Sequence, residues 1–359
     1  MIRKILLFFT ITLIYQNSFS AVVGWNSSLP EESKFKITRE LRKRVNFWVS
    51  IYAQYSTTQG VYHLIDDPSV VLGKIDLTDI YEDQGLTDGE KRKLIEIEVK
   101  SKKLILAEKF DVDPKKVRLQ MGLRDRMRKA LFLSGKYLPQ MEAIFSKENL
   151  PIELTRLPFV ESSFNVFAQS KVGASGLWQI MPSVARPQGF ITRNYDKRNH
   201  PIYATKLAAD IMKQNYKSLK SWPLAITAYN HGLSGVKRMM QKSESVSIED
   251  LIASKKVTSS WGFASKNFYA CFLAVLQVER NAAVLFGDDL VKARSLSFRE
   301  YKLPRQKKKS DVLKWYDGSL TRFKQMNPHL NWAALQSKKI VPAGVPLMIP
   351  DKNFSLVRN

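Results

Sequence analysis

The stretch YLPQMEAIFSKENLPIELTRLPFVESSFN, residues 137–165, carries the pattern that decides the fold. The first half of the stretch places large apolar side chains three or four positions apart, which predicts a helix with one buried face: Leu138, Met141, Ile144 and Phe145. A second helix is expected from about Pro151, with Pro158 near its end and Glu161 at its C-terminal turn. Two consecutive helices of this kind predict a compact α-helical domain.

Helical spacing continues through most of the chain, and we predict no strands between about residues 110 and 285. Thr87 and Glu90 have the spacing of a capping box. Asp113 and Pro114 form a typical helix start, and Gly232 a typical helix end. Further helices are expected over residues 34–56, 198–219 and 265–281. The predicted fold class is therefore mainly α.

Glu161 is the first candidate for chemistry, because apolar residues surround it in the sequence LPFVESSF. Burial among apolar groups raises the pKa of a carboxyl group, which then holds a proton near neutral pH. A protonated carboxyl is what the cleavage of a glycosidic bond needs as its general acid. Ser162 can hydrogen-bond to that carboxyl or to nearby backbone. Taken alone, a helical glutamate is more often a solvated surface residue.

Two further segments contain residues suited to binding a sugar. In KVGASGLWQIMP, residues 171–182, Gly176 permits a positive φ and the close approach of a ligand. Trp178 offers a flat face to a sugar ring or to the core, and Gln179 offers a donor and an acceptor to an acetamido group. Tyr229 and Asn230 stand at the end of the helix before Gly232. Each segment alone is more simply explained as a turn or a packed helix terminus.

Together the three segments carry a family resemblance. ESSFN (161–165), GASGLWQIMP (173–182) and AYNHG (228–232), in this order and spacing, resemble lytic transglycosylases with the goose-type lysozyme-like domain. The likeness is strongest to the membrane-bound D type of bacterial murein transglycosylases, and it is specific over about residues 115–285. It implies a lysozyme-like α-helical catalytic domain. It also implies Glu161 as the catalytic acid/base, and these substrate-binding residues: Ser162, Gly176, Gln179, Tyr229 and Asn230.

The chain departs from the family pattern at two places. His231 follows the asparagine, where the family usually has a small residue. The family's later tyrosine position holds Phe268, and Tyr269 stands next to it. We predict Tyr269 as the residue that supplies the missing hydroxyl to the substrate, although one position along a helix turns a side chain by about 100°.

The resemblance implies cleavage of the MurNAc–GlcNAc β-1,4 bond of peptidoglycan without water, leaving 1,6-anhydro-muramyl ends. Glu161 would act first as acid and then as base, and no second carboxylate is marked near the motifs. Three alternatives remain open. Glu161 could use water, as in goose-type lysozyme. His231 and Phe268 favour an inactive, structural or wall-binding protein. The high positive charge favours a basic envelope protein that binds anionic lipid or nucleic acid.

Composition and the N-terminus indicate where the protein works. Arg3 and Lys4, an apolar stretch and the small residues SFSA predict a signal peptide over residues 1–20. We therefore expect an exported protein of a bacterial periplasm or envelope, with no integral membrane segment after cleavage. The net charge of +24 attracts polyanions, which outside the cytoplasm are wall and lipid rather than nucleic acid. The expected partner is the peptidoglycan glycan strand. Four scattered histidines and the single Cys271 predict neither a metal site nor a cofactor, and the sequence leaves the oligomeric state open.

The chain is long enough for several domains, and composition suggests their limits. After the signal peptide we predict a helical N-terminal region over 21–110 and the catalytic domain over 111–290. Residues 291–359 would form a linker and a small C-terminal module. The charged run LPRQKKKSD, residues 303–311, is predicted as linker, and VPLMIP, residues 345–350, as a short strand. The module weakly resembles the wall-binding modules that often follow this catalytic domain, and a plain C-terminal extension is the alternative.

Overall fold

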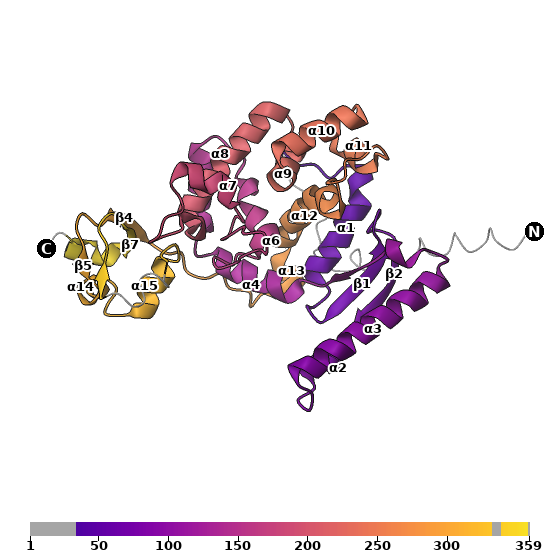
Figure 1. Cartoon of the computed structure of the whole chain (residues 1–359), viewed down its shortest axis with the longest axis horizontal. Coiled ribbons are helices and arrows are strands. Elements are labelled where there is room, and N and C mark those ends of the chain that lie inside the picture. Colours follow the sequence, from indigo (N-terminus) through magenta and orange to yellow (C-terminus); the bar gives the residue numbers. More distant parts are fainter. Residues whose placement is uncertain (1–33, 332–338, 358–359) are drawn as a thin grey trace, which may run out of the picture. The chain divides into compact units, whose positions relative to one another are not determined.

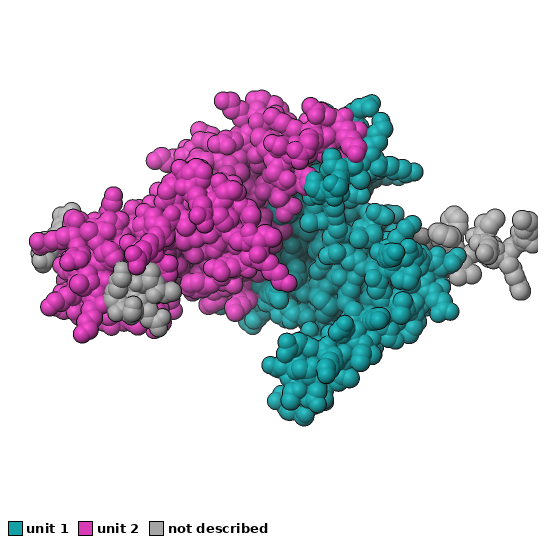
Figure 2. Space-filling view, viewed as in Figure 1, with its two compact units in different colours: residues 1–128, 243–291 teal, residues 129–242, 292–359 magenta. Residues whose placement is uncertain are grey.

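The computed structural model describes residues 34–331 and 339–357 and confirms the mainly α class. The predicted signal peptide lies outside the described residues. The chain divides into two compact units, drawn in teal and magenta in Figure 2. Unit 1 comprises Met1–Arg128 and Ser243–Val291, and unit 2 comprises Lys129–Lys242 and Lys292–Asn359. Each unit is built from two separate segments of the chain, whereas each predicted domain is one continuous segment. The predicted domain limits therefore stay predictions.

Unit 1 contains a small sheet that the sequence analysis did not predict. β1 (Gln59–Leu64) is the central strand, with β2 (Val71–Asp76) and β3 (Val117–Met121) antiparallel on either side. α3 (Asp88–Lys109) lies along this sheet (Figure 1) and buries Leu106 in the shared core. The capping box of Thr87 and Glu90 at its start is confirmed. The prediction of no strands after residue 110 was therefore wrong at β3.

The physical reason for that error lies at Asp113. Its side chain accepts a hydrogen bond from the Lys115 amide, as a helix cap does, but only the single 3-10 turn Pro114–Lys116 follows. The chain then extends and pairs with β1, so that Val117 is buried against Tyr62. Local capping favoured a helix, and pairing with a strand some fifty positions earlier ended it.

Two long helices form the second core of unit 1. α1 (Arg39–Ala53) packs against α12 (Phe263–Arg280), whose residues from Asn267 to Val278 are all buried. The Asn267 side-chain oxygen accepts hydrogen bonds from Arg44 (2.9 Å) and from the Trp48 indole (3.0 Å). This satisfies a buried amide with two charged or aromatic donors and fixes the register of the two helices. The remaining helices of this unit are α2 (Thr78–Glu82), α11 (Ile248–Ala253) and α13 (Ala282–Phe286).

Unit 2 begins with a helical domain in which α8 (Pro201–Leu219) packs against both α9 (Trp222–His231) and α5 (Leu138–Lys147). The face of α5 predicted to be buried contains Met141 and Phe145, which are both fully buried. Gly232 ends α9, as predicted. The other helices here are α4 (Arg124–Ser134), which crosses from unit 1, α6 (Leu157–Ser162), α7 (Pro182–Ala185) and α10 (Leu233–Ser243), with 3-10 turns at Ile152–Arg156, Arg186–Gln188 and Lys197–Asn199.

The C-terminal module, residues 298–357, completes unit 2. Its strand β4 (Phe298–Lys302) pairs with β7 (Pro346–Pro350), which confirms the predicted strand. The predicted linker was wrong, because Leu303 is buried in the module core and Lys307–Lys308 form strand β5 opposite β6 (Ile340–Val341). The charged run is thus an ordered edge of the module, although its composition is typical of a linker. Its helices are α14 (Lys309–Lys314) and α15 (Leu320–Met326), and the 3-10 segment Asp351–Val357 follows β7.

The module is joined to the helical domain by hydrogen bonds of the backbone. The Asp196 amide donates to the His329 carbonyl (2.7 Å), and the Asn331 amide donates to the Asn194 carbonyl (2.8 Å). The buried rings of His200 and His329 meet edge to face at 5.0 Å. These contacts explain why the module and the helical domain form one compact unit.

Across residues 34–331 and 339–357, none of the helices combines the length and the apolar character that crossing a bilayer requires.

Candidate functional site

Glu161 stands in the last turn of α6, as predicted from the sequence. The helix starts at Leu157 with Pro158 in its first turn, so the expectation that Pro158 lies near the helix end was wrong. Proline suits the first turn because its missing N–H would have no helical partner there. The helix stops because Ser163 (φ 51°) and Phe164 (φ 56°) both adopt the left-handed conformation. The Phe164 amide then closes the end by donating to the Pro158 carbonyl (3.1 Å).

The surroundings of the Glu161 carboxyl favour its protonated form. Leu157, Pro158 and Phe159, on the same short helix, are buried, and Glu161 itself is partly buried. Burial raises the pKa of Glu161 to about 8. Among the described residues, none donates a hydrogen bond to this carboxyl or forms an ion pair with it. Glu161 is therefore mainly protonated at neutral pH, which is the state a general acid requires.

Ser162 ties α6 to the glycine turn, residues 168–180. Its hydroxyl lies 2.8 Å from the Leu177 carbonyl and 3.2 Å from the Pro158 carbonyl, and both oxygens can only accept. The single hydroxyl proton is therefore directed at backbone. In this structure Ser162 positions the helix that carries Glu161.

The glycine turn is held close to the backbone of a neighbouring loop. Gly176 has φ +79°, and a Cβ placed there would lie 2.0 Å from the Arg198 carbonyl oxygen. Only glycine fits, because both the backbone angle and the contact exclude a side chain. The Gln179 amide nitrogen donates to the carbonyls of Ala168 (3.1 Å) and Gly176 (2.9 Å). That nitrogen is therefore used within the turn, and the Gln179 oxygen is the atom left to meet a ligand.

Trp178 belongs to the core. It is fully buried, stacks on Phe145 with ring centroids 5.7 Å apart, and donates from its indole to the Thr205 hydroxyl (2.9 Å). Of the two roles considered for this residue, the structure shows the packing one. Its carbonyl accepts a hydrogen bond of 2.7 Å from the Tyr229 hydroxyl.

Tyr229 and Asn230 bring the end of α9 to this group. Burial, and then the negative charge of Glu161, hold the pKa of the Tyr229 phenol well above its usual value. The effect of Glu161 on Tyr229 shows that the two side chains are electrostatic neighbours. Asn230 follows on α9 and is exposed to solvent, so its amide is available to a ligand.

Tyr269 belongs to unit 1. It sits on α12 with 2% of its surface exposed, and its ring stacks with Phe272 at 6.4 Å. Burial raises the pKa of its phenol. The group that unit 2 assembles by itself contains the other six predicted residues, and the role of Tyr269 stays a prediction.

Sequence reasoning missed Arg198, whose side chain holds the glycine turn by hydrogen bonds to its backbone. Arg198 is 7% exposed and donates to the carbonyls of Gly173 (2.8 Å) and Ile180 (2.9 Å), which both belong to that turn. It also binds the Asp196 carboxylate, with an Nη2–Oδ2 distance of 2.7 Å. Asp196 is therefore engaged in a structural ion pair. The spacing of Asp196 and Arg198 is the only signal in the sequence, and it does not reveal which carbonyls the arginine reaches.

The part of the chain that the structure describes contains no set of metal ligands. In that part, no group of three or more His, Cys, Asp or Glu side chains is arranged so that it could hold a metal ion. Cys271 is buried in α12 of unit 1. The chemistry available to the Glu161 group is that of one carboxyl, a phenol, two amides and backbone.

Comparison with known proteins agrees with this arrangement. Residues 141–252 match the profile of the family described as "Transglycosylase SLT domain". Over 142 residues the chain is 33% identical to the membrane-bound lytic murein transglycosylase D of Escherichia coli K12, covering 38% of this chain and 30% of that protein. The protein of the same name from Escherichia coli O6:H1 gives the same values. The chain thus spans under a third of the length of these relatives.

Among solved structures, an inactive mutant of the lytic transglycosylase Slt from Pseudomonas aeruginosa shares 20% identity, with a TM-score of 0.31 over 40% of this chain and 24% of its own. The segment matched by the family profile contains every residue of the group around Glu161, from the end of α6 to the end of α9. Residues 141–252 of this chain are therefore similar to a transglycosylase SLT domain.

Proposed function

We propose that the protein is a peptidoglycan lytic transglycosylase in which Glu161 is the only catalytic acid and base. The observation that carries this proposal is the state of the Glu161 carboxyl, which burial keeps protonated near neutral pH. The SLT domain and the curated relatives, which are named as lytic murein transglycosylases, support the substrate class. The predicted signal peptide, at residues 1–20, agrees with work on the wall outside the cytoplasm.

The reaction starts with proton transfer from Glu161 to the glycosidic oxygen between MurNAc and GlcNAc. The bond from the MurNAc anomeric carbon to that oxygen breaks, and its electron pair stays on the oxygen, which leaves as the GlcNAc 4-hydroxyl. The acetamido oxygen of the same MurNAc stabilises the positive charge that develops at the anomeric carbon. Asn230 is exposed beside Tyr229, so its amide can hold that acetamido group.

The second step regenerates the enzyme without water. Glu161, now ionised, removes the proton of the muramyl 6-hydroxyl, and that oxygen attacks the anomeric carbon to close the 1,6-anhydro ring. The pKa of about 8 suits both roles, because a catalytic group works best when its pKa lies near the operating pH. In unit 2 the nearby Asp196 is bound to Arg198. A second catalytic carboxylate of the kind most glycosidases use is therefore not supplied by it.

Digestion of purified sacculi tests the proposal. The wild-type chain is compared with Glu161→Gln and with the control Glu153→Gln, which removes a partly buried carboxyl from the turn just before α6. We expect muropeptides lighter by one water from the wild type and the control, and none from Glu161→Gln. Products with new reducing ends would show a hydrolase instead. Binding to sacculi without product from any chain would show an inactive wall-binding protein.

A further inference from the structure

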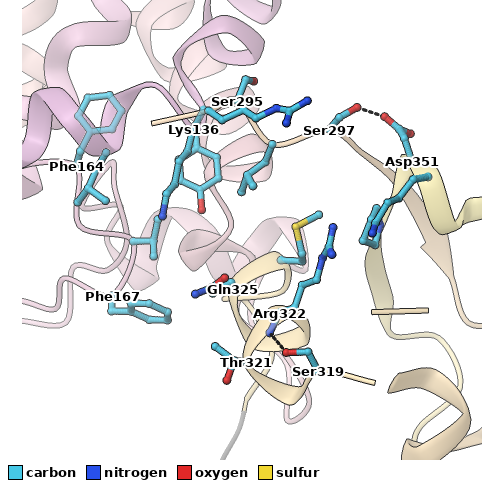
Figure 3. A pocket seen from close by; sticks show the side chains of 18 of the residues that line it. Lys136, Phe164, Phe167, Ser295, Ser297, Ser319, Thr321, Arg322, Gln325 and Asp351 are labelled. Atoms are coloured by element: carbon cyan, nitrogen blue, oxygen red, sulfur yellow. Dashed lines mark hydrogen bonds between the residues drawn. The ribbon is translucent and has the colours of Figure 1, made fainter. Parts of the chain in front are cut away.

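Unit 2 contains a cavity of about 1010 Å³ where the helical domain meets the C-terminal module (Figure 3). One wall comes from residues 133–137 and 164–167 of the helical domain. The other comes from residues 294–297, from α15 and from residues 350–352 at the end of β7. The volume is at the upper end of the range for small-ligand sites, so a ligand of several residues fits, whereas a polymer duplex does not.

The charge of the lining is strongly one-sided. Four cationic side chains, Lys136, Arg294, Arg322 and Lys352, face a single carboxylate, Asp351. Asp351 is already engaged by the Ser297 hydroxyl, as Figure 3 shows, and by Arg299 at 3.0 Å. The cavity therefore presents unbalanced positive charge to a ligand.

Two of the four cations have no internal partner. Arg322 and Lys352 share the Asp317 carboxylate, which lies outside the lining. Lys136 and Arg294 form no ion pair with any residue of the described chain. Both are thus available to a carboxylate, and a charge-assisted hydrogen bond to each would orient a ligand in the cavity.

The rest of the lining combines apolar side chains with six uncharged polar ones: Asn165, Ser295, Ser297, Ser319, Thr321 and Gln325. Phe164 is 2% exposed, and Phe167 is 61% exposed, which is unusual for a phenylalanine. Leu296 and Met326 add aliphatic surface from the module side. The cations and the aromatic surface together suit a short peptide with free carboxylates, and the hydroxyl and amide groups can hydrogen-bond its backbone.

The cavity is continuous with the turn that ends the catalytic helix. Phe164 stands three positions after Glu161, and its ring packs on Phe159 of α6 with centroids 4.5 Å apart. One short segment, residues 161–167, thus carries the candidate acid at its start and the cavity wall at its end. A ligand in the cavity is placed by the same backbone that places Glu161.

We propose that this cavity binds the carboxylate-bearing peptide attached to the glycan strand, with Lys136 and Arg294 as its carboxylate-binding residues and Phe167 as its apolar contact. The inference rests on the proposed function, because the peptide is part of that substrate. It adds a preference: the enzyme favours peptide-bearing strands over bare glycan.

Calorimetric titration of the full chain with a soluble tetrapeptide of the peptidoglycan type tests the site without any catalysis. The Lys136→Met, Arg294→Gln double variant is expected to bind about tenfold more weakly than the wild type. The control is the Lys217→Met, Lys237→Gln double variant, which removes the same charge from exposed helix positions outside the cavity. Equal affinity of the cavity variant and the control, or no binding to the wild type, would overturn the proposal.

A second variant covers the case in which the double variant does not fold. Phe167→Ala removes an exposed ring and leaves the charge unchanged, and Val172→Ala, at a residue 74% exposed, is its control. We expect several-fold weaker tetrapeptide binding by Phe167→Ala and no change by Val172→Ala. Unchanged binding by Phe167→Ala would contradict the assignment of this residue.

Rates on two substrates separate this inference from the proposed function. Product release is measured on intact sacculi and on glycan strands stripped of peptide by an amidase. The ratio of the two rates should fall about tenfold in the cavity variant and stay unchanged in the control. Activity of the wild type with an unchanged ratio would overturn the peptide site alone. Absence of wild-type activity on both substrates would overturn the proposed function, and with it the catalytic use of this cavity, whatever the tetrapeptide binding shows.

Discussion

The Tyr229 hydroxyl donates a hydrogen bond of 2.7 Å to the Trp178 carbonyl, and this bond joins the end of α9 to the glycine turn. Trp178 is fixed in turn by Phe145 and Thr205. Tyr229, an electrostatic neighbour of Glu161, is therefore held on a rigid support. The phenol proton is committed to backbone, which makes Tyr229 a positioning residue in the proposed reaction.

Tyr229→Phe should cost about 1–3 kcal/mol of stability, because the buried Trp178 carbonyl loses its donor. Thermal unfolding followed by circular dichroism measures the effect as a Tm lower by a few degrees. The control is Tyr216→Phe, whose ring lies on the partly exposed face of α8 and stacks on Trp222 at 4.0 Å. Equal Tm values for the two variants would show that the hydroxyl bond contributes nothing.

Gly176→Ala should prevent normal folding of unit 2, whereas Gly189→Ala should be tolerated. Both glycines have positive φ, +79° and +68°, so both substitutions carry the left-handed penalty of about 1–2 kcal/mol. Only at Gly176 does the new Cβ also meet a carbonyl oxygen, at 2.0 Å, whereas nothing lies within 4 Å at Gly189. Urea denaturation of the two variants gives the difference. Similar losses would mean that the loop of Arg198 moves aside at little cost.

The rate of product release should fall on the alkaline side as Glu161 loses its proton. Because burial raises its pKa to about 8, the protonated acid predominates below that pH and is lost above it. The kcat/KM profile on soluble glycan strands should therefore show an alkaline limb near pH 8. A limb near pH 4.5 to 5, with full activity at pH 9, would instead mean that the ionised carboxyl is the active form.

Glu161→Gln should stabilise the protein, and the gain should grow with pH. The folded state keeps the proton up to about pH 8, whereas an unfolded glutamate releases it near the ordinary glutamate pKa of 4.5. Between these two values the unfolded state is increasingly favoured in the wild type, so its stability falls as pH rises. The Tm difference between variant and wild type should be small at pH 4.5 and largest above pH 8. A difference that does not depend on pH would contradict the burial of this carboxyl.

His329 should make unit 2 sensitive to acid. Burial lowers its pKa from 6.5 to about 4, while its ring Nε2 lies 2.9 Å from the Pro346 carbonyl and must donate to it. As pH falls from 6.5 toward 4, His329 takes up a proton in the unfolded chain but not in the folded chain. The free energy of unfolding therefore falls. His200, which meets the same ring, has its pKa lowered further. We expect His329→Asn to lose less Tm than the wild type between pH 7 and pH 5, and equal losses would refute this.

Local patterns predicted the elements whose stability is mostly local. The capping box at Thr87 and Glu90, the buried face of α5 and the glycine that ends α9 are set by residues within a few positions of one another. Glu161 likewise follows apolar residues on α6 that are buried, and burial raises its pKa. The segments of the candidate site were visible for this reason.

What could not be predicted depends on distant partners. β3 pairs with β1 across the whole length of α3, so its strand character is fixed by a neighbour far away in sequence. Trp178 looked equally suited to a sugar and to a core, and only the stacking on Phe145 decides between them. The chain returns to unit 1 after residue 242, and no local signal in the sequence marks that crossing.

The interleaving of the two units has a consequence for how the chain reaches its native state. Arg44 and Trp48 of α1 bind Asn267 of α12, which follows Arg44 by 223 positions. While the polypeptide emerges from a ribosome or a translocation pore, α1 lacks its α12 partner until all of residues 141–252 have also appeared. Long-range closure of this kind slows folding. The face of α1 that packs on α12 thus stays without that cover until the last part of unit 1 has emerged, and a chaperone could cover it in the meantime.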